Sequence, residues 1–226
     1  MPTQSITLSD PPANKIKALY QICATLVASA EANADASTQG WHSWFYTYLL
    51  WHESAQLSTR TQRGAGPGRG LMQFEATTAW DTIKIHVLGP TPGLIARLAD
   101  AAGVDADSQM KPALRGFAAL GDPDNVWPDD SPVNQVEAWL LSSDSFGICL
   151  MQIQFERFHA TLPPLPPVAA GEDPRNTDYH AQFAQVWADS WWKGPADQQS
   201  ARLQQFLTSA ATLDQALPQL VASTVV

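Results

Sequence analysis

Apolar residues recur every three or four positions along most of the chain, the spacing of helices with one buried face. The clearest case spans residues 16–30, where Leu19, Cys23 and Val27 follow one another one turn apart. The preceding Asp10-Pro11-Pro12 is typical of a helix start, because a carboxylate can cap the first turn and proline fits within it. The pattern therefore predicts an amphipathic helix of about 20 residues here.

The same spacing predicts further helices along the rest of the chain. They cover residues 41–54, 77–87, 92–102, 112–119, 132–142, 146–158, 178–192 and 197–220. Residues 31–40 are small and polar and end in Gly40, so we expect a loop there. The segment 60–70 is too rich in glycine for regular structure. Because alternating strand patterns are scarce, the sequence predicts a mainly α protein.

Five prolines lie within residues 161–176, which favours a stiff, extended connector. We therefore expect a helical domain over residues 1–160, a proline-rich connector over 161–176, and a C-terminal helical subdomain over 177–226 that packs on the first domain. A chain of 226 residues is long enough for one sizeable core with a small satellite.

Net charge and hydropathy exclude several classes of function. The chain carries 22 acidic and 13 basic residues and a net charge of −9, so its field repels phosphate backbones and disfavours nucleic-acid binding. No apolar run approaches the length of about 18 residues that a membrane span requires. The polar residues 1–14 lack the apolar centre of a signal peptide.

The cysteines and histidines give no sign of a metal or cofactor. Cys23 and Cys149 lie in apolar surroundings without a CxxC motif, so we interpret both as small buried hydrophobes, and a disulfide between them is the alternative. The five histidines form no metal-binding motif, and His52-Glu53 lacks the second histidine of HExxH. We expect neither a metal nor a cofactor.

Glu53 is the candidate for acid chemistry. It ends the predicted helix 41–54 and follows Trp51 and His52. A carboxyl group beside apolar rings loses hydration in its charged form, so its pKa should rise, as a general acid near neutral pH requires. A solvated glutamate at a helix end is the ordinary alternative. Trp41, Trp44 and Trp51 are the nearest candidates for a surface on which a sugar ring could stack.

A second segment supports Glu53 as a functional residue. Gly64, Gly66, Gly68 and Gly70 allow the backbone to approach a ligand closely, and Leu71-Met72-Gln73-Phe74 follows directly. A single amide in an apolar run must be hydrogen-bonded if it is buried, or it is presented to a ligand. No Gly-Lys-Ser/Thr follows, so the segment is no phosphate-binding loop.

Together these residues resemble the lysozyme-like lytic transglycosylases, whose pattern is Glu-Ser-Gly, a variable loop, Gly-Leu-Met-Gln and Thr-Ala. Here the matching pieces are Glu53-Ser54-Ala55, Gly70-Leu71-Met72-Gln73 and Thr78-Ala79, in the same order. Arg69 and Glu75 match the version found in lysozyme-like proteins of tailed bacteriophages. The resemblance covers about 30 residues, and alanine stands at position 55 where the family has glycine.

The resemblance implies a lysozyme-like helical fold that binds a peptidoglycan glycan strand, with Glu53 protonating the glycosidic oxygen. Ser54 and Gln73 would orient the acid and the sugar, within a substrate-binding segment that includes Gly70, Leu71, Met72 and Glu75. A transglycosylase needs no second carboxylate, because the substrate's own N-acetyl group or 6-hydroxyl completes the reaction. A hydrolase needs one, and Glu75 and Asp81 are the nearby candidates.

Two functions remain open at this point. One is a peptidoglycan-cleaving enzyme, a lytic transglycosylase or muramidase, encoded by a phage and associated with its virion. Such an enzyme would be made in the cytoplasm without a signal peptide and would act in the periplasm or cell wall. The other is a non-catalytic structural protein of the virion, in the tail, neck or ejection apparatus, on the same scaffold and in contact with other virion proteins.

Overall fold

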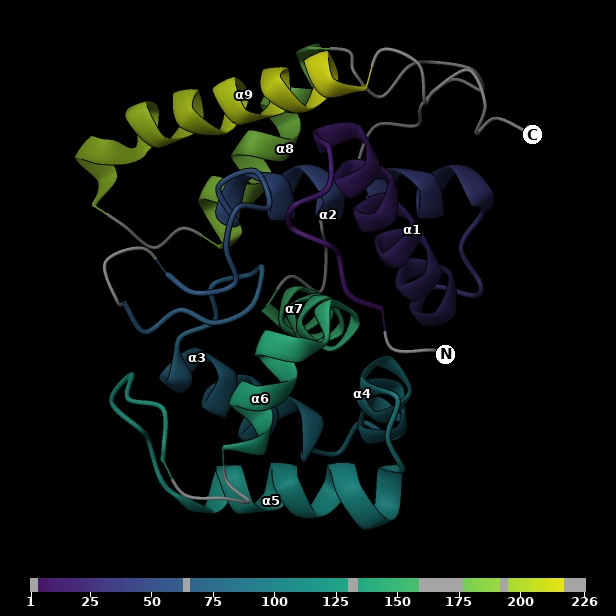
Figure 1. The fold of residues 1–226 in the computed structure, drawn as a ribbon, viewed down its shortest axis with the longest axis vertical. Helices are drawn as coiled ribbons and strands as arrows, with labels where there is room; N and C mark the ends of the chain where they lie inside the picture. The colour runs from purple at the N-terminus through teal and green to yellow at the C-terminus, as the bar shows by residue number, and fades with distance from the viewer. Residues whose placement is uncertain (1–3, 63–65, 130–133, 159–176, 192–194, 218–226) are drawn as a thin grey trace. The chain divides into compact units, whose positions relative to one another are not determined.

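A computed structural model describes residues 4–62, 66–129, 134–158, 177–191 and 195–217. Most of these residues are helical, and no strand forms among them beyond two isolated bridges. The α-helices are α1 (Pro12–Ala30), α2 (Ala36–Glu53), α3 (Ala76–Asp81), α4 (Leu94–Ala102), α5 (Lys111–Ala119), α6 (Gln135–Ser142), α7 (Asp144–Phe158), α8 (Thr177–Ser190) and α9 (Gln199–Ala216). Figure 1 shows their course. The mainly α class is thus confirmed for the described residues.

The chain divides into two compact units. Unit 1 consists of Met1–Ile6 and Ser58–Phe158, and unit 2 of Thr7–Leu57 and His159–Val226. Each unit is described by itself. The domain boundaries expected from the sequence remain a prediction, and the proline-rich connector 161–176 lies outside the described residues.

Unit 1 contains α3 to α7, packed around phenylalanine and aliphatic side chains. Its fully buried residues include Phe74, Leu98, Leu114, Phe117, Phe146 and Phe155. The predicted helix 77–87 begins as α3 and continues as a π-helix over Thr82–Val87. A second π-helical turn, Ala106–Met110, was not predicted; the Asp105 side chain caps it by accepting from the backbone N–H groups of Asp107 and Ser108.

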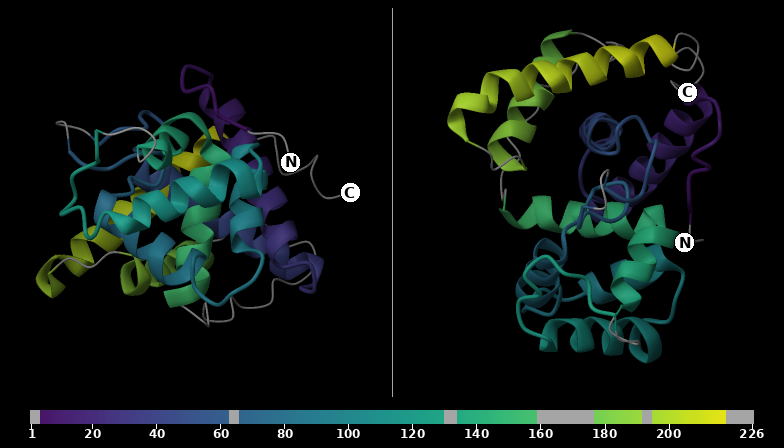
Figure 2. Two further views of the ribbon diagram at one scale, coloured as in Figure 1. Left: turned by 90° about the horizontal axis from the view of Figure 1, so that it is seen from below. Right: turned by 60° about the vertical axis from the view of Figure 1, so that its left-hand side comes forward.

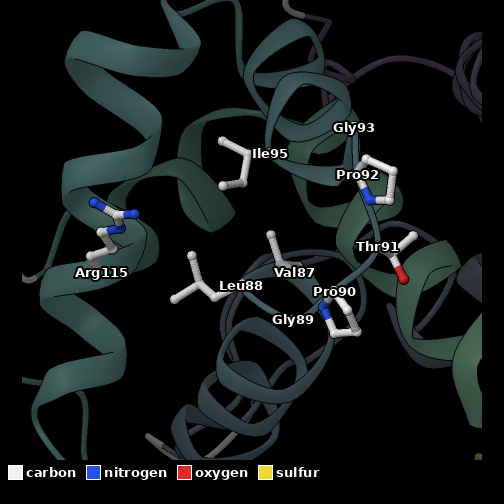
Figure 3. A pocket seen from close by; sticks show the side chains of 9 residues that line it. All are labelled: Val87, Leu88, Gly89, Pro90, Thr91, Pro92, Gly93, Ile95 and Arg115. Atoms are coloured by element: carbon white, nitrogen blue, oxygen red, sulfur yellow. The ribbon is translucent and has the colours of Figure 1, made fainter.

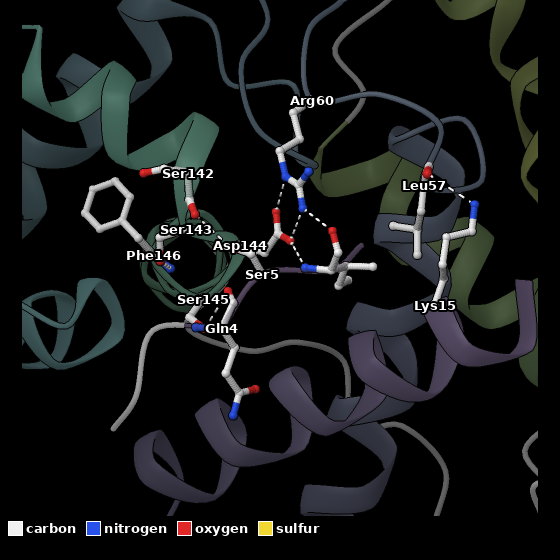
Figure 4. A network of polar contacts seen from close by, with 11 residues as sticks. Gln4, Ser5, Lys15, Leu57, Arg60, Ser142, Ser143, Asp144, Ser145 and Phe146 are labelled. Atoms are coloured by element: carbon white, nitrogen blue, oxygen red, sulfur yellow. Dashed lines mark hydrogen bonds and ion pairs between the residues drawn. The ribbon is translucent and has the colours of Figure 1, made fainter. Parts of the chain in front are cut away.

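An ion pair fixes the N-terminal segment of unit 1 to the start of α7. The Arg60 guanidinium contacts both oxygens of Asp144, at 2.8 Å and 2.6 Å, and donates to the Ile6 carbonyl at 2.6 Å (Figure 4). The Ile6 N–H in turn donates to Asp144 at 2.6 Å. Because the Asp144 side chain is fully buried, these bonds replace the water that its charge loses.

Unit 2 contains α1, α2, α8 and α9, and α8 packs against α9, to which it is steeply inclined (Figures 1 and 2). The periodic residues of α1 form its buried face, including Ile16, Leu19, Cys23 and Val27, so the first predicted helix is confirmed. Aromatic rings fill the space between the helices: Phe183 of α8 lies 5.5 Å from Phe45, centroid to centroid. Four helices thus enclose one aromatic core.

Two local predictions are wrong. Residues 36–40 belong to α2 and not to a loop, because Asp35 caps the helix by accepting from the Thr38 N–H at 2.9 Å, and Gly40 lies within it. Asp10 does not cap α1; Pro11 holds the N-cap position without a side-chain hydrogen bond, and Pro12 begins the helix. Proline at the first position of α1 is enough to begin the helix without a capping side chain, because proline has no N–H that would be left unsatisfied there.

Both cysteines are fully buried and free, as the sequence predicted, and their surroundings raise the pKa of each thiol to about 12 through burial. Within the described ranges, no helix is long and apolar enough to cross a membrane.

Candidate functional site

Glu53 is the last residue of α2, and its side chain is half-buried within unit 2. The indole N–H of Trp187, on α8, donates to Glu53 Oε1 at 2.6 Å. Trp187 itself is 2% exposed, so the core of the unit fixes the direction of this donor. One carboxyl oxygen of Glu53 is therefore held, and the other has no hydrogen-bond partner among the residues that the structure describes.

The surroundings of Glu53 favour its neutral form. Burial raises the pKa of Glu53 from 4.5 to about 7, while the Trp187 hydrogen bond and the charge of Arg202 oppose the rise. Loss of hydration is the larger effect, because only one donor and one exposed arginine replace the water. Near pH 7, about half of the molecules therefore carry a protonated Glu53.

His52 completes an aromatic wall beside the acid. Its ring lies edge-on to Trp187 at 4.9 Å and 5.2 Å from Phe206, centroid to centroid. Its Nδ1 lies 3.0 Å from the Ser209 hydroxyl. Burial, with the charge of Arg202, lowers the pKa of His52 to about 4, so the ring is neutral at physiological pH. His52 therefore carries no positive charge that would stabilise the ionised form of Glu53.

A left-handed turn follows Glu53. Ala55, Gln56 and Leu57 have φ angles of 49°, 65° and 55°, in the region that favours glycine. Lys15 donates to the Gln56 and Leu57 carbonyls, each at 3.3 Å, and the Ser54 hydroxyl accepts from the Leu57 N–H at 2.9 Å. Three strained residues in a row persist because buried side chains hold them.

Ser54 is completely buried, and its hydroxyl also donates to the Leu50 carbonyl at 2.6 Å. The resemblance gives this residue a role in orienting the acid and the sugar. In the structure its hydroxyl connects the end of α2 to the turn that follows.

The segment Gly70-Leu71-Met72-Gln73 lies in unit 1. Leu71 and Met72 are buried, at 2% and 1% exposure, and serve as core residues. Gln73 is half-buried with φ of 52°, and its amide donates to the Gly70 carbonyl at 2.7 Å. The Gln73 side-chain oxygen has no partner among the residues that the structure describes. The side-chain nitrogen of Gln73 thus closes the turn, and its side-chain oxygen remains as a hydrogen-bond acceptor.

The described part of the glycine-rich segment is ordered by specific contacts. Arg69 pairs with Glu137 at 2.6 Å and donates to the carbonyls of Gly66 and Gly68. The Trp127 indole donates to the Pro67 carbonyl at 2.6 Å. The loop is therefore irregular, as predicted, but attached to its unit at several points.

Gly70 is the position in this segment that requires glycine, with φ of 71° and a built Cβ only 2.9 Å from the Leu140 carbonyl oxygen. Glu75, half-buried, precedes α3 without capping it through its side chain.

The predicted site residues therefore fall into two groups. Glu53 and Ser54 belong to unit 2, whereas the segment from Gly70 to Glu75 belongs to unit 1, as does Asp81. Within unit 1, the Gln73 side chain contacts Gly70 through the hydrogen bond that closes the turn of this segment. Within unit 2 the structure brings Glu53 together with Trp187, which sequence reasoning did not connect to it.

The expected sugar-stacking tryptophans are mostly core residues. Trp41 is 4% exposed and packs on Tyr179, and Trp51 is 2% exposed with its N–H donated to Thr212 at 3.1 Å. Both are therefore unavailable to a sugar. Trp44 is half-buried and packs on Tyr20, with the ring centroids 4.4 Å apart and the rings tilted by 34°.

In the sequence, Trp187 and Trp191 form a pair one helical turn apart, and nothing in the pattern links Trp187 to an acid 134 residues away. Among the side chains that the structure places, no group of three or more His, Cys, Asp or Glu residues is arranged to hold a metal ion.

Comparison of this chain with protein-family models, with curated proteins and with solved structures finds no match.

Proposed function

We propose that this protein is a lysozyme-like enzyme that cleaves the glycan strand of peptidoglycan, with Glu53 as the general acid. The observation that carries the proposal is the partly protonated carboxyl at neutral pH, held by a buried indole donor. The paired motifs around Glu53 and Gln73, which resemble those of lytic transglycosylases, supply the substrate class. Glutamates with these properties protonate leaving groups in glycosidic cleavage.

The hydrogen bond from Trp187 assigns roles to the two carboxyl oxygens. Oε1 accepts the indole N–H at 2.6 Å, so in the neutral acid the proton resides on Oε2. Oε2 would donate this proton to the glycosidic oxygen as the bond to C1 breaks. The resulting carboxylate keeps the Trp187 hydrogen bond and the nearby Arg202 charge, both of which favour its ionised form.

The matching motif, Glu53-Ser54 followed by Gly70-Leu71-Met72-Gln73, supports the transglycosylase version of the proposal. Within unit 2, Arg202 is the charged residue that lowers the Glu53 pKa. The 6-hydroxyl of the substrate would then attack C1 and return its proton to Glu53, which leaves a 1,6-anhydro end and regenerates the acid. A hydrolase would require a second carboxylate across the scissile bond.

The biological setting follows from the phage-type version of the motif. We place the enzyme in the virion, with the glycan strand as substrate and other virion proteins as neighbours. Delivery by a virion would bring it to the cell wall.

Digestion of purified peptidoglycan tests the proposal. Wild type should release soluble muropeptides with 1,6-anhydro ends, and Glu53→Gln should release at least about a hundredfold less, because it has no proton to donate. Glu31→Gln is the matched control: Glu31, in the same unit, contacts His42 at 2.6 Å, away from the candidate site. It should behave like wild type.

Equal release by wild type and Glu53→Gln would refute the catalytic role of Glu53. Reducing ends in place of anhydro ends would indicate a hydrolase. Absence of release by wild type, together with co-purification of the protein with phage particles, would favour the structural virion protein.

A further inference from the structure

Unit 1 contains a hollow of about 280 Å³ that the candidate site does not use (Figure 3). It lies where the π-helix Thr82–Val87, the loop 88–93, the start of α4 and one face of α5 meet. Its walls include the aliphatic side chains of Val87, Leu88 and Ile95, and Arg115 of α5 lines it as the one charged residue of its lining. The hollow is therefore lined by polar and apolar groups in similar measure, with three aliphatic side chains and a single cation among them.

The loop that forms one side of the hollow is fixed by its sequence. Gly89 cannot be replaced without a shift, since a built Cβ would lie 2.5 Å from the Ile85 carbonyl oxygen. Gly93 has φ of 87°, which favours glycine. Pro90 and Pro92 lock two further φ angles. The hollow is thus formed before any ligand arrives, which lowers the entropic cost of binding.

Arg115 differs from the other arginines of unit 1 whose side chains the structure describes. Arg60, Arg69 and Arg97 each pair with a carboxylate, from Asp144, Glu137 and Glu156 respectively. Arg115 makes neither a hydrogen bond nor an ion pair with any residue that the structure describes. In a chain with nine more acidic than basic residues, an arginine without a described acidic partner at a partly aliphatic hollow indicates a site for an external anion.

We propose that this hollow binds a carboxylate attached to a short aliphatic group. The planar guanidinium of Arg115 can hold both carboxylate oxygens, and Val87, Leu88 and Ile95 would cover the aliphatic part. The volume lies just below the range of about 300 to 1,000 Å³ of typical ligand pockets, which limits the ligand to about the size of one amino-acid residue. A free branched short-chain acid and the C-terminus of a peptide that ends in an aliphatic residue share this chemistry. The proposal is independent of the role of Glu53, which belongs to unit 2.

Titration of the ¹⁵N-labelled full chain, followed by amide chemical shifts, tests the site. The probes are 4-methylpentanoate, N-acetyl-Ala-Leu with a free carboxylate, and the same dipeptide as its C-terminal amide. We expect saturable shifts that gather at residues 87–95 and around Arg115, with the amide at least about tenfold weaker than the acid. Tighter binding of 4-methylpentanoate or of the dipeptide acid identifies the source of the carboxylate.

Two variants separate the guanidinium from general charge. Arg115→Gln should weaken binding of the acids at least about tenfold. The matched control is Lys111→Gln, which removes a positive charge one turn earlier on α5, where Lys111 lies 3.5 Å from Asp107. It should leave binding unchanged. Arg115 is exposed, so its replacement leaves the core intact.

The proposal is overturned if neither acid binds saturably, if acid and amide bind equally, or if the shifts gather outside the hollow. Equal weakening by Arg115→Gln and Lys111→Gln would also overturn it, because a general loss of charge would then explain the binding.

Discussion

Replacing Glu53 with glutamine should change how the stability of the protein depends on pH. Glutamine has the size of protonated glutamate and can still accept the hydrogen bond from Trp187, but it does not ionise. In wild type, burial raises the pKa of Glu53 to about 7 from an ordinary 4.5. Between pH 4.5 and pH 7, the folded state therefore keeps a proton on Glu53 that the unfolded state has lost.

The magnitude follows from the two pKa values. Their difference of about 2.5 pH units corresponds to about 3 kcal/mol, and because Glu53 is only half-buried, solvent screening makes this an upper bound. The stabilising effect of the raised pKa is fully present below pH 4.5. It is lost as pH rises through 7, so the free energy of unfolding of wild type falls by up to about 3 kcal/mol relative to Glu53→Gln.

Urea denaturation at unit steps from pH 4 to pH 9, followed by circular dichroism, measures this difference. His52 titrates in both proteins, so its contribution cancels in the comparison. Trp187→Phe removes a donor that lowers the Glu53 pKa, so the fall should extend to higher pH in that variant. Parallel curves for wild type and Glu53→Gln between pH 4.5 and 7 would refute the reasoning.

Three further substitutions and one matched control, Gly116→Ala, test the local geometry, each by urea denaturation. Ala55→Gly should stabilise the fold by about 0.5–1 kcal/mol, because φ at this position is 49°, and a loss of stability would contradict the strained turn. Asp144→Asn should cost about 3 kcal/mol by leaving the Arg60 guanidinium without its carboxylate, and a cost below about 1 kcal/mol would count against a buried ion pair. Gly70→Ala should cost about 1–2 kcal/mol, because φ at this position is 71° and the new Cβ would clash with the backbone. Gly116→Ala, in open space on α5, should stabilise the fold by about 0.5–1 kcal/mol. Similar effects of the two substitutions would contradict the requirement for glycine at position 70.

Helical periodicity predicted most of the fold because the apolar stripes of α1, α4 and α5 are the faces that the core buries. It failed where a single side chain decides a boundary. Asp35 begins α2 five residues before the expected start, and its capping bond overrides the low helix propensity of Gly40.

The candidate acid could be identified from its neighbours in sequence, but its environment could not. Trp51 and His52 suggested poor hydration of Glu53, yet the residue that binds the carboxyl, Trp187, comes from another helix. Tertiary packing alone brings α2 and α8 together. A local pattern carries no information about such a contact.

The turn after Glu53 had no signal in the sequence either. Ala55-Gln56-Leu57 contains no glycine, asparagine or aspartate, the residues that ordinarily mark positive φ. Contacts from Lys15 and Ser54 impose the conformation instead. Strain at this position lies directly beside the candidate acid, where functional sites often accumulate it.

A ¹³C NMR titration of the Glu53 side-chain carboxyl, assigned by loss of its signal in Glu53→Gln, tests most directly whether a protonated acid persists at neutral pH. The environment of α2 and α8 predicts a midpoint near pH 7 in the folded protein. A midpoint near 4.5, the ordinary glutamate value, would contradict the acid role and with it the assignment of glycan cleavage.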